Sequence, residues 1–353
     1  MGGHIVCMNV GLRLLLAQHG GLVLRSQLLD IGLSPSRITQ LCRAGALIVV
    51  RRGVYADAEL WESLDEYRGR PRLRARAAVM KLQRGWVMSH DSAALELGMP
   101  LLWPKASLTH VTRPGFSAAW TRYGVKHHYA RYRPSQLLDI DGRRVLDAAR
   151  TAVDLAREHG EQEGVVACDW ALRNGTTRAA LLEALVPMAS WPYVVRARSA
   201  VEHADPRAEN ANETLGRLLV QELGIGPVDL QFPVAITGGV AWCDLRVGNH
   251  IFEIDGRIKY QSTDRGGVSD RDGSQVVWDE RKRQRLVCAE GLGMSRIIWE
   301  DYWGVARKEA MARLRAEYAV TLARFGPELS PRLAASAERL RAIHGLRDRA
   351  HGA

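Results

Sequence analysis

The stretch Ser34–Asp57, SPSRITQLCRAGALIVVRRGVYAD, predicts a helix followed by a β-hairpin. Ser34 can cap the helix, and Pro35 suits its first turn. The apolar residues that can face inward are Ile38, Leu41 and Leu47, and the polar residues left outside are Ser36, Arg37, Gln40 and Arg43. Residues 47–57 alternate as two short strands would, with a turn at 51–53.

Two further segments precede this stretch and complete a compact motif. Residues 11–21, GLRLLLAQHGG, predict a helix that glycines end, and residues 23–32, VLRSQLLDIG, predict a short helix with Ser26 at its start. Three helices and a hairpin wing are typical of a winged helix-turn-helix, which we expect over residues 8–60. The candidate DNA-binding residues are Ser36, Arg37, Gln40, Arg43, Arg51 and Arg52. The alternative is a small helical protein-interaction module whose arginines are solvated.

The formal net charge of +10 makes polyanions, and nucleic acid first among them, the partners to consider. Residues 1–80 hold eleven arginines against six acidic residues, a net of +5, so charge and motif agree. A high-GC genome is the alternative explanation of an Arg-rich and Ala-rich composition.

The cysteines and the apolar segments indicate the compartment. Five scattered cysteines without a CxxC pair fit a reduced cytoplasm and argue against a structural zinc site. The chain has no apolar run long enough to span a membrane, and its first twenty residues lack a cleavable signal pattern. We therefore expect a soluble cytoplasmic protein without a membrane partner.

A mixed middle domain is expected over residues 61–200. SHDSAALELGMPL at 89–101 predicts a helix that ends at Gly98, SLTHVTRP at 107–114 predicts a strand, and DGRRVLDAARTAVDLAREHG at 141–160 predicts a helix with Leu146 on its apolar side. Two further helices joined at 174–175 follow. His90 beside Asp91 and the His127–His128 pair raise a catalytic or metal hypothesis, but capping, core hydrogen bonding or surface exposure is the favoured interpretation.

The order of these segments resembles a known family. The winged helix, SHDSAALELGMP, HVTRP and DGRRVLDAARTAVDLAR follow one another as in the AbiEi antitoxins, and the resemblance covers residues 8–185. AbiEi antitoxins are the repressor partners in a bacterial abortive-infection type of toxin–antitoxin system. The resemblance implies sequence-specific DNA binding through the amino-terminal domain, autoregulation and a cognate toxin as partner.

From Glu209 the pattern changes to the order α, β, β, β, α, β. Asp244 and Glu253 lie on strands joined by a short turn, and Asp255 shares a face with Glu253. With Glu213 from the preceding helix, these carboxylates suit Mg²⁺ or Mn²⁺, and the predicted metal ligands are Glu213, Asp244 and Glu253. Such a metal activates water for phosphodiester hydrolysis, and a nearby lysine can neutralise the transition state; the candidates are Lys259 and Lys282.

This second half resembles the PD-(D/E)XK, or restriction-endonuclease-like, superfamily over residues 205–304. More closely, it resembles a small carboxy-terminal module of that superfamily in actinobacterial proteins with an AbiEi-like front. The resemblance implies catalytic roles for Glu213, Asp244, Glu253, Asp255, Lys259, and Glu280 with Lys282. The superfamily's lysine stands two residues after the glutamate, where this chain has Asp255, so Lys259 would have to take its role. The alternative is a turn at Asp255–Gly256 and an inactive site.

The expected architecture is α+β multidomain: a winged helix-turn-helix, a mixed middle domain, an α/β restriction-endonuclease-like domain and a helical appendage over 305–353. The sequence predicts a DNA-binding protein with a magnesium-dependent endonuclease domain, in phage defence or a toxin–antitoxin setting. The alternative is a transcriptional repressor or antitoxin with a catalytically inactive nuclease fold. A small-molecule enzyme is disfavoured because no glycine-rich phosphate loop or nucleophile elbow occurs. A cognate toxin and a second copy of the chain are left open as partners.

Overall fold

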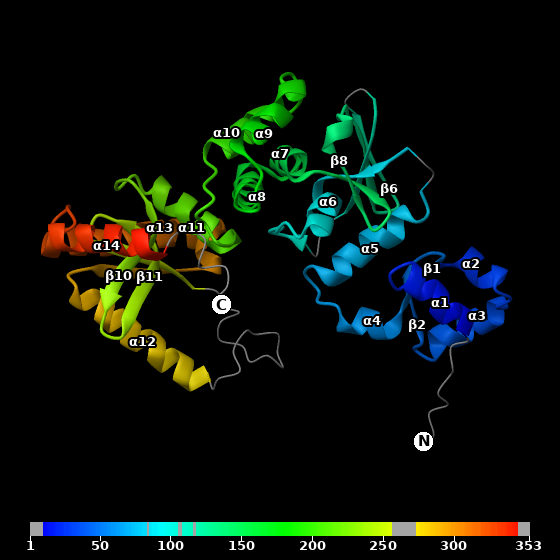
Figure 1. Ribbon diagram of the computed structural model, residues 1–353, viewed down its shortest axis with the longest axis horizontal. Coiled ribbons are helices and arrows are strands. Elements are labelled where there is room, and N and C mark those ends of the chain that lie inside the picture. The colour runs from blue at the N-terminus through cyan, green and yellow to red at the C-terminus, as the bar shows by residue number, and fades with distance from the viewer. Residues whose placement is uncertain (1–9, 83–84, 105–107, 116–117, 256–272, 345–353) are drawn as a thin grey trace. The chain divides into compact units, whose positions relative to one another are not determined.

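The computed structural model describes residues 10–82, 85–104, 108–115, 118–255 and 273–344 (Figure 1). The chain divides into two compact units, Met1–His203 and Ala204–Ala353. We describe each unit by itself.

The first unit begins with three helices and a small antiparallel sheet. The elements in order are α1 (Val10–Gln18), β1 (Leu22–Leu24), α2 (Arg25–Asp30), α3 (Pro35–Arg43), β2 (Leu47–Arg51) and β3 (Val54–Asp57). The strand order is β1-β3-β2. Buried side chains from all three helices form one core with Leu47 and Tyr55 from the sheet.

Local chemistry explains why α3 begins and ends where it does. The Ser34 hydroxyl accepts a hydrogen bond from the Arg37 amide at 3.2 Å, and Pro35 takes the first helical position, as predicted. Ile38 and Leu41 are buried. One expectation needs correction, because Leu47 is buried on β2 instead of on the helix. Ser26, expected to cap or start its helix, is the second residue of α2, and the N-cap residue is Leu24.

The rest of the first unit is a six-stranded mixed sheet with helices. The elements are α4 (Ala58–Ser63), α5 (Gly69–Val79), β4 (Val87–Met88), α6 (His90–Leu97), β5 (Thr109–Arg113), β6 (Ala118–Arg122), β7 (Val125–Tyr129), β8 (Leu137–Ile140), β9 (Arg143–Leu146), α7 (Ala148–His159), α8 (Glu161–Arg173), α9 (Arg178–Leu185) and α10 (Val194–Glu202). The strand order is β6-β7-β5-β4-β9-β8. The predicted helix over 141–160 is wrong in its first part, because Arg143–Leu146 pairs with β8 and the helix begins at Ala148 behind the Asp147 cap.

The second unit has the predicted order of elements. It contains α11 (Ala211–Glu222), β10 (Asp229–Ile236), β11 (Gly239–Val247), β12 (His250–Asp255), α12 (Gly273–Ala289), β13 (Gly293–Ile298), α13 (Gly304–Phe325) and α14 (Pro331–His344). The strand order is β10-β11-β12-β13. The first two pairs are antiparallel, whereas β12 and β13 are parallel because α12 lies between them in the chain.

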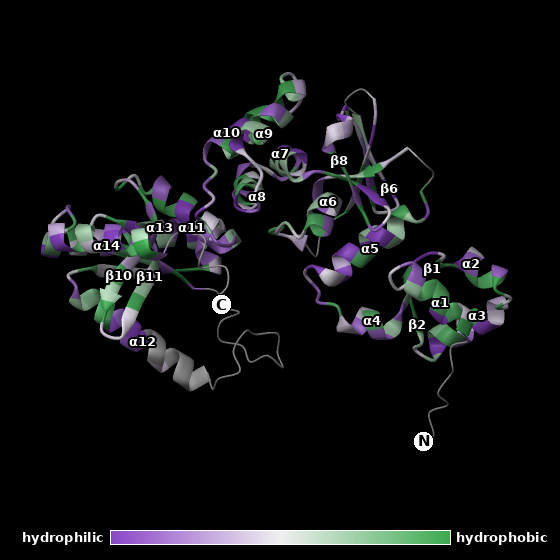
Figure 2. Cartoon of the chain, in the orientation of Figure 1, coloured by the Kyte–Doolittle hydropathy of each residue, from purple (hydrophilic) through white to green (hydrophobic). Residues whose placement is uncertain are grey.

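Hydropathy follows this architecture. Figure 2 shows hydrophobic and hydrophilic residues alternating around the helices, as expected where one helix face packs on a core. In the second unit, Phe232, Cys243 and Ile251 on the sheet pack with Val287 of α12 and Leu333 of α14. Among the described residues, no helix is both long and apolar enough to cross a membrane.

Candidate nucleic-acid interface and carboxylate site

The outer side of α3 presents polar side chains on a helix whose inner side is fixed by the core. Ser36, Gln40 and Arg43 are exposed, and Arg37 is half-buried. The Arg37 guanidinium donates a hydrogen bond to Gln40 Oε1 at 2.6 Å. This side therefore offers hydroxyl, amide and guanidinium groups of the types that read base edges and phosphates in a major groove.

The β2–β3 hairpin holds its two arginines differently. The Arg51 guanidinium donates to the carbonyl oxygen of Tyr123 at 3.0 Å, and burial lowers the pKa of Arg51. Arg52 is exposed, and its carbonyl oxygen accepts a hydrogen bond from Lys81 Nζ at 3.0 Å. Arg51 thus ties the hairpin to the β6–β7 turn, while the Arg52 side chain faces solvent.

A cavity of ≈ 1020 Å³, which we call the basic cavity, lies between the hairpin, α5 and the β6–β7 turn. Among the described residues that line it, none is acidic, and the basic ones are Arg51, Arg52, Arg74, Lys81 and Arg122. Arg122 lies over the Tyr123 ring and Arg74 over the Trp61 ring. The cations of the basic cavity are groups that hold a nucleic-acid backbone.

The net charge of the chain is concentrated in the first unit. Residues 1–203 contain 27 Lys and Arg against 18 Asp and Glu, which gives +9, whereas residues 204–353 contain 22 against 21, which gives +1. The two values add to the +10 of the whole chain. Attraction to a polyanion is therefore a property of the first unit.

Glu213, one of the predicted metal ligands, is a buried carboxylate with three hydrogen-bond donors around it. Its oxygens accept hydrogen bonds from the Glu209 amide at 2.8 Å, from Asn210 Nδ2 at 2.7 Å and from Gln231 Nε2 at 3.0 Å. Burial and the charge of Asp244 raise the pKa of Glu213 to about 7. Asp244 lies on β11, where it accepts a hydrogen bond from the Ile254 amide of β12 at 2.8 Å.

The other two carboxylates have guanidinium partners. Glu253 lies 3.2 Å from Arg283 of α12, and Asp255 lies 2.9 Å from Arg296 of β13. These ion pairs neutralise both side chains within the protein. The two ion pairs also explain why Glu253 and Asp255 can share one face of β12 without strong repulsion between their carboxylates.

The lysine candidates stay predictions. Lys259 lies outside the described residues. Lys282 is exposed on α12, the helix that also contains Glu280.

The described carboxylates do not meet as a metal-ligating group. Within the part of the chain that the structure describes, the group of three or more ligand side chains close enough to hold one ion is His90, His110 and His128. For Glu213, Asp244 and Glu253, a magnesium site therefore does not follow from the described geometry, and we derive no catalytic step from it. Sequence reasoning noted His90 and His128 but missed His110, which stands in the predicted strand 107–114 without a charged neighbour to mark it.

Comparison with known proteins finds a family whose members resemble the amino-terminal part of the chain. Residues 12–56, from α1 to β3, match the family described as transcriptional regulator, AbiEi antitoxin. This match lies within the span 8–185 that resembles the same family in sequence.

Two similar proteins come from Mycobacterium tuberculosis. The uncharacterized proteins MT2308 of strain CDC 1551 and Rv2248 of strain H37Rv are each 29% identical to this chain over 202 residues, which is 56% of this chain and 68% of theirs. The crystal structure of the RV2827C protein from the same species aligns with a TM-score of 0.36 and 18% identity over 54% of this chain and 76% of that chain.

Proposed function

We propose that this protein is a DNA-binding transcriptional regulator of the antitoxin type, which contacts a duplex with its first unit. The observation that carries the proposal is the match of residues 12–56 to AbiEi antitoxin regulators, since these residues include α3 and the β2–β3 hairpin. In this proposal the segment α1–β3 is a winged helix-turn-helix, α3 is its recognition helix and the hairpin is its wing.

Three features of the first unit support this assignment. The exposed side of α3 holds Ser36, Gln40 and Arg43, and the half-buried Arg37 braces Gln40. The basic cavity adjoins the hairpin through Arg51 and Arg52. The net charge of +9 on residues 1–203 supplies the long-range attraction that duplex DNA requires.

The first test is binding of the wild-type chain to the DNA upstream of its own coding region, followed by fluorescence anisotropy at two salt concentrations. We expect Arg43→Ala to weaken binding by roughly 5- to 150-fold, because a lost base or phosphate contact costs about 1–3 kcal/mol. Gln40→Ala should reduce the preference for this DNA over unrelated DNA, because an amide reads base edges.

Arg198→Ala provides the matched control, since Arg198 is an exposed arginine on α10 of the same unit. It removes the same charge and should change the affinity less than two-fold. Equal affinity of the wild type for upstream and unrelated DNA, together with equal affinity of all three variants, would show that α3 does not recognise DNA.

A second candidate function is metal-dependent phosphodiester cleavage by the second unit, with Mg²⁺ or Mn²⁺. It is favoured by one observation: Asp244 and Glu213 lie close enough that the charge of one raises the pKa of the other, within the order α, β, β, β, α, β of a PD-(D/E)XK domain. The ion pairs of Glu253 and Asp255, and the near-zero charge of this unit, weigh against it.

Calorimetry with Mg²⁺ and Mn²⁺, run beside a plasmid and single-strand cleavage assay, separates the two candidates. Cleavage by the wild type that is lost together with metal binding in Asp244→Asn would support the nuclease. A folded wild type that binds neither ion and cleaves neither substrate leaves a regulator whose second unit recognises DNA or a partner. Co-purification with the product of a neighbouring toxin gene, and light scattering for a homodimer, would then identify that partner.

A further inference from the structure

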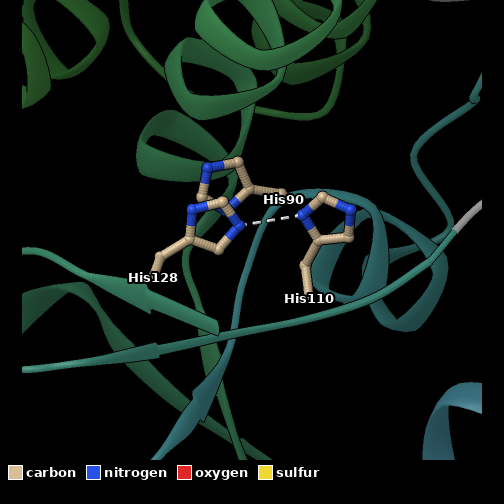
Figure 3. A group of neighbouring side chains, drawn as sticks. All are labelled: His90, His110 and His128. Carbon is tan, nitrogen blue, oxygen red and sulfur yellow. Dashed lines mark hydrogen bonds between the residues drawn. The ribbon is translucent and has the colours of Figure 1, made fainter. Parts of the chain in front are cut away.

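The three histidines His90, His110 and His128, which we call the histidine cluster, meet in the interior of the first unit (Figure 3). His90 is the first residue of α6, His110 lies on β5 and His128 on β7. All three are buried, with exposed fractions of 3%, 1% and 8%. One nitrogen from each lies within 4.8 Å of the others.

The topology explains why residues so far apart in sequence converge. Strands β5 and β7 are parallel neighbours with Thr112 opposite His128. His110 is two residues before Thr112, so His110 and His128 share one face of the sheet. The start of α6 brings His90 onto the same face, where its ring stacks on His128 with a centroid separation of 3.9 Å (Figure 3).

We propose that the histidine cluster is a binding site for a first-row transition-metal ion of the zinc type. A zinc–nitrogen distance of about 2.0–2.1 Å in tetrahedral geometry requires ligand nitrogens roughly 3.4 Å apart. His110 Nδ1 and His128 Nε2 are 3.0 Å apart, and the ligand nitrogens of the three rings all lie within 4.8 Å of one another. The His90 and His128 rings are stacked, so at least one of them must rotate for its in-plane lone pair to point at the same ion, and a water molecule or another donor would complete the shell.

A metal-bound imidazole usually donates its other ring N–H group to a nearby acceptor, and residues around the histidine cluster offer such acceptors. His110 Nε2 lies 3.8 Å from Asp91 Oδ1, so binding of a metal through Nδ1 leaves the Nε2 proton facing a carboxylate. Asp91 is itself fixed by His159 Nε2 at 2.6 Å. His90 has Ser89 Oγ at 3.0 Å from Nδ1 and Asp154 Oδ1 at 4.0 Å from Nε2.

The backbone at His90 agrees with a ligand role. His90 has φ +47°, in a region that residues other than glycine seldom adopt. Such a conformation costs free energy, persists only where the surrounding structure holds it, and is common at ligand sites.

Imidazole nitrogen suits Zn²⁺, Co²⁺, Ni²⁺ and copper better than magnesium. The site thus differs in chemistry from the carboxylates of the second unit, and it does not depend on the proposed function. Bound there, an ion would cross-link α6, β5 and β7.

The test uses the full chain without a histidine tag, stripped with a chelator and titrated with Zn²⁺ and with Co²⁺. We expect one ion per chain, visible d–d bands with Co²⁺ that Zn²⁺ abolishes, and a higher Tm in the presence of Zn²⁺. His110→Gln and His128→Gln should lose the stoichiometric ion and the bands.

The matched control is His127→Gln. His127 is the sequence neighbour of His128, but its ring stacks on Trp120 at 4.9 Å on the opposite face of β7. His127→Gln should bind one ion as the wild type does. If a cluster variant fails to fold, X-ray absorption spectroscopy of the Zn²⁺-loaded wild type tests the proposal instead, because the spectrum should show three imidazole ligands on the zinc ion. A folded wild type that binds no ion, or binding that survives in His110→Gln and His128→Gln, would overturn the proposal.

Discussion

Glu163 on α8 is buried, and its Oε1 accepts a hydrogen bond from the Leu102 amide at 2.9 Å. Burial raises the pKa of this carboxyl to about 7, although the nearby His159 and the amide act in the opposite direction. The free-energy cost of burying the charged Glu163 carboxylate therefore exceeds the stabilisation that the Leu102 amide and His159 give to that charge. No sequence pattern marks this residue, because its environment is assembled from segments about sixty residues apart.

Glu163→Gln tests this balance. The pKa of Glu163 is higher in the folded protein than its value of 4.5 in an unfolded chain, so its stabilising contribution is complete below pH 4.5 and is lost as pH rises through 7. Glutamine keeps the acceptor for the Leu102 amide without the charge. We expect the variant to be more stable than the wild type at pH 8, by up to about 3 kcal/mol, and close to it at pH 5.

Urea unfolding of both proteins at the two pH values measures the difference. The control is Glu161→Gln on the same helix, where the side chain is 45% exposed and the change should stay below about 1 kcal/mol at both pH values. A wild type that equals Glu163→Gln at pH 8 would mean that the carboxylate is accommodated in its charged form.

Residues whose role is local were predictable, and residues whose role depends on distant partners were not. Ser34 was identified as a cap because its hydroxyl and the amide that donates to it, that of Arg37, are three positions apart. The hydrogen bond from the Arg51 guanidinium to Tyr123, 72 residues away, had no signal in the sequence, and DNA binding by Arg51 stays a prediction. The cysteine pattern argued against structural zinc, whereas the histidine cluster needs no cysteine and draws its ligands from three separate elements.

At the scale of elements, α8 packs so closely on its neighbours that one position admits only glycine. A Cβ added at Gly164 would lie 2.3 Å from Ala156 Cβ, 2.8 Å from Ala156 Cα and 2.9 Å from Ala200 Cβ. Ala156 belongs to α7 and Ala200 to α10, so Gly164 is the point at which three helices meet. The contact involves backbone, which cannot move away as a flexible side chain would.

Gly164→Ala should destabilise the protein by about 1–3 kcal/mol, because overpacking outweighs the roughly 1 kcal/mol that alanine gains over glycine in a helix. The reverse exchange at Ala179, which is exposed in the first turn of α9, should cost at most about 1 kcal/mol, the value that helix propensity gives for a helix interior. Chemical denaturation of the three proteins compares the effects. A more stable Gly164→Ala would show that the helices separate easily at this point.

Elements with local signals were predicted well, and pairings across long separations were not. The helices α3, α8 and α9 follow caps, glycines and apolar spacing that lie within each segment. Strand β9 was taken for the start of a helix because RRVL precedes a strong helical pattern without a glycine or proline between them. The sheet order β6-β7-β5-β4-β9-β8 depends on partners that no local pattern names.

At the scale of the molecule, the chain joins two units of different charge. Each unit has its own buried core: Leu28, Ile38 and Leu41 belong to one in the first unit, and Phe232 and Ile251 to one in the second. The net charge of +9 on residues 1–203 contrasts with +1 on residues 204–353. The sequence already placed a net charge of +5 on residues 1–80, and the division of the chain shows that the excess extends over the whole first unit.

A fragment of residues 1–203 should therefore fold cooperatively and bind upstream DNA with the affinity and salt dependence of the full chain. Counterion release depends on the number of phosphates that Lys and Arg neutralise, so an equal slope of log K against log salt means that the same contacts are made. The fragment 204–353 should fold and bind DNA only weakly. Circular dichroism melting and anisotropy at several salt concentrations measure both fragments. A smaller slope for residues 1–203 than for the full chain would show that the second unit contributes phosphate contacts of its own, despite its nearly balanced charge. That result would favour phosphodiester cleavage by the second unit over regulation by the first unit alone.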